Sequence, residues 1–423
     1  MNRTYTPELA PDALDRLAEY AGHFRADFNR PRQAAWCGVY LRGLLKDADR
    51  KSIEPMAREA VLPAGLAVAD PDQALQQFVS QSTWDEQAVW RRYRARMGEA
   101  FADPAGIFVI DDTTFPKQGK HSAGVQRQYC GALGKKANCQ CAVSVHYVAP
   151  SGHYPLAMRL YLPDSWLGDP DRLDKARVPE GERRPLSKGQ IALGSLDQAR
   201  AEGLPGRVVI ADSGYGVSGP FRDGLAERGL HYIVGVAEEM VVFAERPRWV
   251  GPKGATGGRP QKRRRLAADS PRPVSLKELA EQTPRHKITW REGTKGPMWG
   301  RFAWLRVWPG HGWQTGDCAE EGPLWLLIEE RSNGEVKYAL SNLPPQTSCV
   351  RAVRLWKSRW PVEQGYQQLK EELGLDHFEG RSWRGFHHHA ALTLLAYGFL
   401  LLERQRREKH PAGPEKKGVA GGC

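Results

Sequence analysis

Residues 107–112, Ile-Phe-Val-Ile-Asp-Asp, are a short apolar, β-branched run that ends in two carboxylates. Such a run is typical of a buried strand. Residues 207–212, Arg-Val-Val-Ile-Ala-Asp, repeat the pattern, with Asp212 directly after the apolar stretch. If the two strands are neighbours in one sheet, Asp111, Asp112 and Asp212 project at adjacent strand ends. We expect an electronegative notch there, because like charges at that spacing repel each other unless cations relieve them.

The sequence around these two runs predicts a mixed α/β sheet. Further strand-like runs occupy residues 141–148, 152–162 and 231–236. Helical patterns occupy residues 185–202 and 219–228. Consecutive strands come first, and strands alternating with helices follow. This order is typical of a mixed sheet with helices on its faces.

The segments outside the predicted sheet differ from it in character. Residues 8–100 show helical periodicity without a strand pattern, so we expect a small helical domain. Residues 287–330 return to strand patterns separated by Gly and Pro, which predicts a second, antiparallel β-module. Residues 251–272 are rich in Gly and Pro and carry a basic run, which suits a solvated linker as well as a contact with phosphates. After Pro344 the pattern is helical to about residue 408.

The composition is that of an ordinary globular protein with an excess of positive charge. The 423 residues include 61 Lys and Arg against 49 Asp and Glu, a formal net charge of +12. Such an excess favours polyanionic partners, although many basic proteins bind no nucleic acid. The longest apolar run, residues 390–402, is shorter than the roughly 20 residues that cross a bilayer, so we expect no membrane span. The N-terminus lacks an apolar secretory core and the seven cysteines show no disulfide pattern, which favours a cytoplasmic protein.

A further carboxylate stands in residues 358–370, Ser-Arg-Trp-Pro-Val-Glu-Gln-Gly-Tyr-Gln-Gln-Leu-Lys. Pro361 suits the first position of a helix, which puts Glu363 in the first turn. Glu363 and Lys370 then share one helical face, so a potential metal ligand lies in line with a cation that can hold a phosphate. Spacing alone favours an ordinary solvated face. The combination with the strand-end acids is what points to a site.

The donor types decide which cofactors these residues suit. Carboxylate oxygens without His or Cys suit hard cations, so we expect Mg²⁺ or Mn²⁺. The spacing of the cysteines near His146 does not fit a zinc site. The histidines at 387–389 point in different directions on a helix, so we expect buried or capping roles for them. The sequence has neither a Gly-x-Ser-x-Gly elbow nor a Walker loop, which argues against a serine hydrolase and against ATP-driven chemistry.

Taken together, these residues resemble the DDE transposases of bacterial insertion sequences. The resemblance is to the group with a Tyr-x2-Arg-x3-Glu-x6-Lys signature around the last acid, which here reads Trp356, Arg359, Glu363 and Lys370. Trp in place of Tyr removes the phenol hydroxyl but keeps a planar aromatic ring. Residues 110–140 and 211–216 are similar to the segments around the first and second acids. The similarity runs from about Gln33 to Leu402.

The resemblance implies an RNase H-like catalytic domain in which Asp111, Asp212 and Glu363 are the catalytic acids and metal ligands. Relatives have Asp-x-Thr or Asp-x-Ser at the first site, which favours Asp111 because Thr113 follows it, with Asp112 as the alternative. Two cations about 4 Å apart would support in-line displacement at phosphorus. The implied activity is DNA transposition, a form of DNA recombination, by endonuclease cleavage at the transposon ends and strand transfer into target DNA.

With this resemblance, the segments predict five parts along the chain. They are a helical DNA-binding domain (1–100), the first part of the RNase H-like core (101–240), a β-rich insertion with a basic loop (241–345), the C-terminal helices of the core with the last acid (346–408) and a disordered tail (409–423).

The implied partners are the terminal inverted repeats and the target DNA, held by a homodimer in the bacterial cytoplasm at the nucleoid. We expect DNA contacts at Arg359, Lys370, Trp356, Lys117, Lys120, His121 and Trp299. Two alternatives remain open at this point: a catalytically silent DNA-binding protein of transposase origin, and an RNase H-like nuclease that cuts without joining. The presence of all three acids favours the enzyme.

Overall fold

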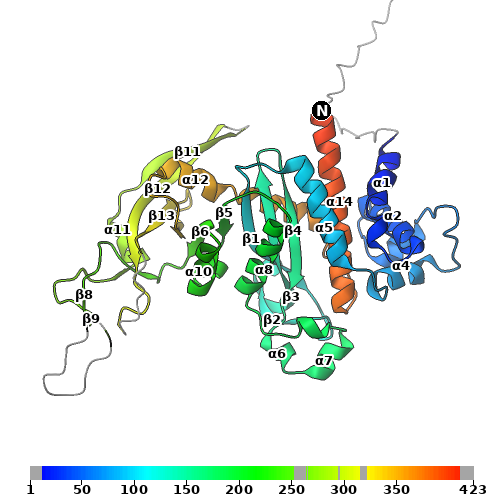
Figure 1. Ribbon diagram of the computed structural model, residues 1–423, viewed down its shortest axis with the longest axis horizontal. Helices are drawn as coiled ribbons and strands as arrows, with labels where there is room; N and C mark the ends of the chain where they lie inside the picture. Colours follow the sequence, from blue (N-terminus) through cyan, green and yellow to red (C-terminus); the bar gives the residue numbers. More distant parts are fainter. Residues whose placement is uncertain (1–11, 252–262, 264, 294–295, 315–321, 410–423) are drawn as a thin grey trace, which may run out of the picture.

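The computed structural model describes residues 12–251, 263, 265–293, 296–314 and 322–409 (Figure 1). In this part of the chain, twelve strands form one mixed sheet and two more form a small ribbon. The strands of the large sheet are β1 (Ile107–Pro116), β2 (Gln126–Cys130), β3 (Lys135–Ala149), β4 (Gly152–Leu160), β5 (Val208–Ala211), β6 (His231–Val236), β7 (Val241–Phe243), β10 (Val274–Ser275), β11 (His286–Gly293), β12 (Gly296–Pro309), β13 (Leu324–Glu330) and β14 (Val336–Ser341). The ribbon pairs β8 (Trp249–Val250) with β9 (Arg265–Leu266).

The centre of the large sheet has the strand order β4–β3–β1–β5–β6. β1 pairs antiparallel with β3 and parallel with β5, and β5 pairs parallel with β6. Three antiparallel strands followed by two parallel ones agree with an RNase H-like sheet, and the mixed α/β prediction is confirmed. One detail differs: β1 does not end at its two acids but continues to Pro116, because β3 pairs with it along its whole length.

The predicted β-module is present, but it is not a sheet of its own. β14 pairs antiparallel with β6, and β13 and β12 follow, so these strands extend the central strands at the β6 edge. In Figure 1 this extension curves away from the central strands. This pairing places β13 and β14, which begin at residue 324, beside β6, which ends at Val236.

Helices cover both faces of the sheet and fill one end of the molecule. They are α1 (Ala13–Gly22), α2 (Pro31–Leu45), α3 (Ile53–Arg58), α4 (Pro71–Ser80), α5 (Glu86–Phe101), α6 (Asp164–Leu167), α7 (Pro170–Lys175), α8 (Lys188–Ala201), α9 (Ser213–Gly216), α10 (Gly219–Glu227), α11 (Leu276–Gln282), α12 (Cys349–Lys357), α13 (Trp360–Gln367) and α14 (Trp383–Lys409). 3₁₀ turns occupy Arg25–Asp27, Gly131–Leu133 and Glu180–Glu182, and a π-helical turn, Gln368–Glu372, follows α13. The helices predicted at 185–202 and 219–228 are confirmed as α8 and α10.

The N-terminal helices pack around α14. Figure 1 shows α14 between the sheet and the helices α1, α2 and α4, and α14 contacts α2, α4, α5 and β4. Residues Trp383 to Phe399 of α14 are almost all buried, because this helix has neighbours on every side. The apolar run at 390–402 is thus part of a protein core, and in the described ranges no helix is long and apolar enough to cross a membrane. One hydrophobic cluster joins the N-terminal helices to the sheet, from Leu17 through Leu392 to Phe108. The five-part division stays a prediction, and the tail at 410–423 lies outside the described residues.

Candidate active site

Two of the predicted acids lie next to each other on adjacent parallel strands. Ile110 of β1 pairs with Ala211 of β5. Asp111 is the next residue of β1, and Asp212 directly follows the last residue of β5. β5 ends at Ala211, and Asp212 caps the short helix α9, where its Oδ1 accepts a hydrogen bond from Gly214 N at 2.9 Å. The sheet therefore brings the first two acids together at the point where β5 stops.

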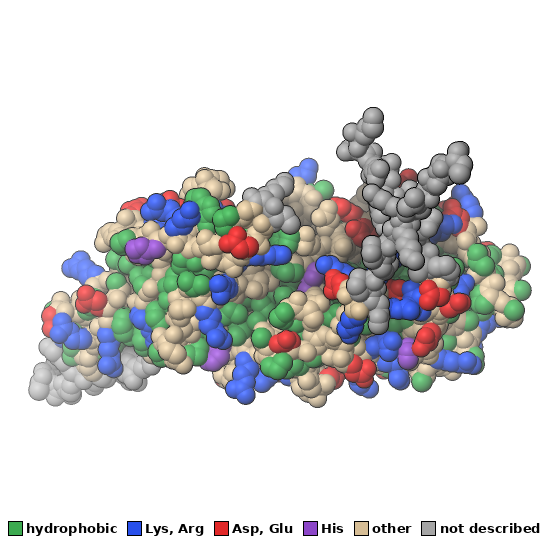
Figure 2. Space-filling view, turned by 90° about the horizontal axis from the view of Figure 1, so that it is seen from above, with side chains coloured by type: hydrophobic (Ala, Val, Ile, Leu, Met, Phe, Trp, Pro, Cys, Tyr) green, Lys and Arg blue, Asp and Glu red, His purple; other side chains and the backbone are tan. Residues whose placement is uncertain are grey.

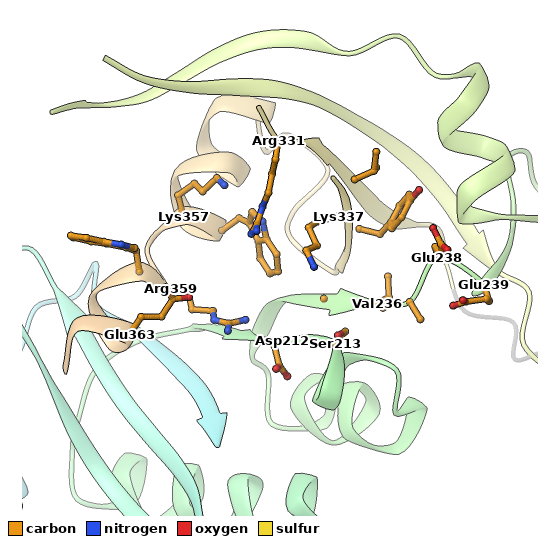
Figure 3. Close-up of a pocket in the computed structure, with 16 residues that line it drawn as sticks. Asp212, Ser213, Val236, Glu238, Glu239, Arg331, Lys337, Lys357, Arg359 and Glu363 are labelled. Carbon is orange, nitrogen blue, oxygen red and sulfur yellow. The ribbon is translucent and has the colours of Figure 1, made fainter. Parts of the chain in front are cut away.

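The second and third acids, Asp212 and Glu363, line the same cavity, which has a volume of about 650 Å³. Glu363 lies in the first turn of α13, with Pro361 at the start of the helix, and it lines the cavity together with Asp212 and Arg359. In Figure 3 the side chain of Arg359 extends between Glu363 and Asp212. Two acids that are far apart in the sequence thus face one space.

Asp111 is not among the residues that line this cavity and is largely buried, with 14% of its side chain exposed. Burial raises the pKa of Asp111 from its ordinary 3.8 to about 7, although Arg359 opposes the rise and Asp212 adds to it. Arg359 Nη2 is 3.6 Å from Asp111 Oδ2. Arg359 is therefore the residue that connects Asp111 with the cavity. A carboxyl group near its titration midpoint at neutral pH is typical of functional sites.

The two neighbouring acids of β1 point to opposite faces of the sheet, because successive side chains alternate along a strand. Asp111 lies on the face of Val109, which packs against Val362 of α13. Asp112 lies on the other face, where Lys188 Nζ of α8 is 2.6 Å from Asp112 Oδ2. Of the two, Asp111 faces the helix with the third acid, whereas Asp112 is neutralised by an ion pair.

The three carboxylates have the chemistry of a divalent-cation site but are not assembled into one. Within the described ranges, no group of three or more His, Cys, Asp or Glu side chains lies close enough together to hold a metal ion. The roles of Asp111, Asp212 and Glu363 as catalytic acids and metal ligands stay predictions. Like carboxylates repel each other when no bound cation relieves them, and the Arg359 guanidinium is the cation beside Asp111. The donor set of oxygen atoms still fits Mg²⁺ or Mn²⁺.

The predicted phosphate-binding cations fall into two groups. Arg359 lines the cavity, and its Nε is buried without a hydrogen-bond partner in the described part of the chain. Lys117 Nζ, in contrast, donates to the carbonyl of Phe378 at 2.6 Å. Lys370 Nζ donates to the carbonyl of Thr114 at 3.1 Å. Burial lowers the pKa of both lysines. In this conformation they hold the segment after α13 against β1 and do not face solvent freely.

The remaining predicted DNA contacts differ in exposure. Lys120 and His121 are exposed in the loop after β1. Trp299 on β12 is 51% exposed, and Lys287 Nζ lies 4.4 Å from the centroid of its ring. An exposed ring beside a cation suits stacking on a base next to a phosphate. Trp356 is half-buried instead: it lines the cavity, and its indole N–H donates a hydrogen bond within the protein.

Sequence reasoning missed three cations on the other wall of the cavity, Arg331, Lys337 and Lys357. Figure 3 shows them above Arg359 and Asp212, on the sheet extension and on α12. Arg331 and Lys337 gave no signal in the sequence, because only the pairing of β14 with β6 places them at the site. Lys357 had a weak signal, since it follows the signature Trp356 directly.

The three consecutive histidines of α14 have structural roles, as expected. His387 Nδ1 bonds to the carbonyl of Trp383, His388 Nδ1 to that of Val79, and His389 Nε2 to that of Gly374. All three are buried. Burial lowers their pKa values, so the rings remain neutral near pH 7.

The fold and the strand-end acids agree with what comparison with known proteins shows. The model of the DDE superfamily endonuclease family matches residues 23–297, and this chain belongs to that family. The chain is also similar to a probable transposase for insertion sequence element IS701 from Microchaete diplosiphon, with 29% identity over 237 residues. That match covers 56% of this chain and 57% of the relative. The family match contains Asp111 and Asp212 and ends before Glu363.

Proposed function

We propose that this protein is a transposase that cuts DNA at the ends of an insertion-sequence element and joins those ends to target DNA. The observation that carries the proposal is the meeting of three distant segments at Arg359. This residue contacts Asp111 and lines one cavity with Asp212 and Glu363. The family membership and the similarity to an IS701 transposase support the same activity.

In the proposed chemistry the protein positions the metal ions and the DNA, and it supplies the charged groups that bind them. Asp111, Asp212 and Glu363 would hold divalent cations, Mg²⁺ or Mn²⁺, and two of them when DNA is bound. Bound divalent cations supply Lewis-acid activation of a hydroxyl group and charge stabilisation at phosphorus. Deprotonated Asp111 is the ligand form, so metal binding would release the proton that the raised pKa of Asp111 retains. Arg359 is proposed to turn from Asp111 to a phosphate oxygen, for which its planar fork is suited.

The proposed DNA path follows the cations around the cavity. Arg331, Lys337 and Lys357 line the cavity with Asp212 and Glu363 and, although each also pairs with a glutamate of the sheet extension, they add positive charge that can attract phosphates. Trp299 on β12 and Lys287 on β11 are proposed to extend this surface, and exposed Lys120 to extend the DNA path beyond β1. On the face seen in Figure 2, Lys and Arg side chains are spread along the whole molecule, with acidic side chains among them. A long DNA segment fits this distribution better than a compact anion does.

Two further parts of the proposal concern assembly. A homodimer is proposed because two element ends have to be held together for joining. The substrates are proposed to be the terminal inverted repeats of the element and target DNA at the nucleoid.

The test is cleavage of a supercoiled plasmid that carries both ends of the element flanking this coding sequence, in the presence of Mg²⁺. We expect nicked and linear products, followed by products joined to a second plasmid. Asp212→Asn should bind the ends and give no cleavage. Equal cleavage by wild type and Asp212→Asn would refute the proposed chemistry. Tight binding without any cleavage would identify a silent DNA-binding protein, and cleavage without joined products would identify a nuclease.

A further inference from the structure

A buried carboxylate links the sheet extension to the helix that precedes the third acid. Glu329 on β13 is 3% exposed. Its Oε2 accepts a hydrogen bond from Trp356 Nε1 at 2.8 Å, and its Oε1 accepts one from Lys357 Nζ. Arg331 Nε lies 3.4 Å from the same Oε1. Burying an ionised carboxylate away from water costs free energy unless hydrogen-bond donors surround it. Loss of one of these contacts should therefore weaken the position of the others.

Two of these donors, Trp356 and Lys357, come from the last turn of α12. Trp356 and Lys357 precede Arg359 by three and two residues, and the turn between α12 and α13 is only Ser358–Arg359 long. A shift of Trp356 should therefore also move Arg359, because the turn between the two helices is too short to compensate for it. Glu363 follows in the first turn of α13.

The indole ring of Trp356 is held on its other side as well. It packs against the cluster formed by Val109 of β1 and Ile210 of β5, which underlies the two strand-end acids. The ring of Trp356 thus packs against the strands that lead to Asp111 and Asp212, and its N–H is hydrogen-bonded to the sheet extension. The orientation of the hydrogen bond fixes the rotation of the ring between them.

We infer that Glu329 is a positioning residue for the proposed cleavage reaction: through Trp356 and Lys357 it sets where Arg359 and Glu363 stand relative to the strand-end acids. This inference rests on the proposed function. Trp in place of the signature Tyr leaves a donor at this position. The indole keeps a directional N–H donor where the carboxylate of Glu329 accepts it.

The chain provides a matched control in the next residue of the same strand. Glu330 points to the opposite face, where it pairs with Arg285 and Arg301, and its side chain is 35% exposed. It has no contact with α12 among the interactions of the described residues. Glu329→Gln and Glu330→Gln therefore remove the same charge from neighbouring positions, and only the first affects the link to Trp356.

The experiment compares both variants with wild type in single-turnover cleavage of an element end and in Mn²⁺ binding without DNA. We expect Glu329→Gln to slow cleavage roughly 10- to 100-fold at saturating DNA, with little change in the Kd for the element end. Its Mn²⁺ affinity should fall as well, while Glu330→Gln keeps both values. Trp356→Phe should slow cleavage too, and adding it to Glu329→Gln should cost little more, because both act through one hydrogen bond.

The outcomes separate the inference from the function on which it rests. Cleavage and Mn²⁺ binding that are the same in Glu329→Gln and Glu330→Gln would overturn the positioning role. The positioning role would also be overturned if the fold-losses in cleavage rate of Glu329→Gln and Trp356→Phe multiply in the variant that carries both substitutions. If Glu329→Gln does not fold, Trp356→Phe decides: slower cleavage at an unchanged Kd supports the link, and weaker end binding at an unchanged rate overturns it. Wild type that binds Mn²⁺ but never cleaves would refute the proposed function, and the Mn²⁺ affinities alone would then test Glu329.

Discussion

Arg359 Nη2 lies 3.6 Å from Asp111 Oδ2, so a guanidinium group stands where a cation is needed beside the first acid. It partly offsets the burial of Asp111 and the charge of Asp212, yet the pKa of Asp111 is still raised to about 7. Arg359 is thus the cation that pairs with Asp111, whereas Arg331, Lys337 and Lys357 pair with glutamates of the sheet extension. This balance leads to predictions about metal binding, stability and pH.

Replacing Arg359 should separate metal binding from catalysis. At pH 8.5 Asp111 is ionised, and Arg359→Gln removes the cation that competes for it. We expect Mn²⁺ to bind several-fold more tightly in the absence of DNA, since a partly exposed ion pair is worth about 1 kcal/mol. Cleavage should nevertheless be slower, because the phosphate loses its guanidinium partner. Isothermal titration with Mn²⁺ checks the first part, and weaker Mn²⁺ binding would contradict it.

The two adjacent acids of β1 should respond to substitution in opposite ways. Asp111→Asn removes a destabilising buried charge, so we expect it to raise the free energy of unfolding at pH 8 by roughly 1–3 kcal/mol while abolishing cleavage. Asp112→Asn breaks the ion pair with Lys188, so we expect it to lower stability and leave measurable cleavage. Denaturant unfolding and plasmid cleavage check both variants. Loss of cleavage in Asp112→Asn alone would transfer the role of first acid to that residue.

The stability contribution of Asp111 should depend on pH with a definite sign. Its folded-state pKa is about 7 against an ordinary 3.8, so between these values the folded protein binds more protons than the unfolded chain. Stability from this group is therefore present at pH 4 and is lost as the pH rises towards 7. We expect the stability difference between Asp111→Asn and wild type to grow over that range and to level off above it. A difference that does not change with pH would contradict the raised pKa.

Metal affinity should follow the same ionisation in the other direction. A cation needs the carboxylate form of Asp111, so affinity should fall by about tenfold for each pH unit below 7. Asp111→Asn should show a much shallower dependence. Mn²⁺ titrations between pH 5.5 and 8.5 measure this directly, and equal slopes for the two proteins would count against Asp111 as a ligand.

The exposed and buried lysines near the first acid should behave differently towards DNA. Lys120 is exposed, so Lys120→Ala should weaken DNA binding for all sequences and reduce the salt slope by about one. Lys370 is hydrogen-bonded to the carbonyl of Thr114, so Lys370→Met should reduce stability first, by about 1 kcal/mol. Binding titrations at several salt concentrations and thermal unfolding separate the two. A salt slope that Lys120→Ala leaves unchanged would remove this residue from the DNA surface.

The sequence was informative where local pattern decides the structure. Apolar runs that end in acid located β1 and β5, and the proline at the start of α13 placed Glu363 in a first turn. The continuation of β1 to Pro116 could not be read from its own residues, because it depends on pairing with β3.

The rest of the site depends on contacts between residues far apart in the chain. The predicted antiparallel module is an extension of the catalytic sheet, since its last strand pairs with β6. That pairing places Arg331 and Lys337 in the cavity and Glu329 under Trp356. Whether Lys370 faces DNA or a backbone carbonyl is likewise a matter of packing, which helical spacing does not encode.

The central claim is that Glu363, which lies beyond the family match, completes the catalytic centre with Asp111 and Asp212. The most direct measurement is single-turnover cleavage of an element end by Glu363→Gln, with Glu371→Gln as the control. Glu371 is exposed in the turn after α13, where it bonds to Gln367. We predict that Glu363→Gln binds the end normally and cleaves roughly a hundredfold more slowly or not at all, while Glu371→Gln cleaves like wild type. Cleavage by Glu363→Gln at the wild-type rate would contradict the account.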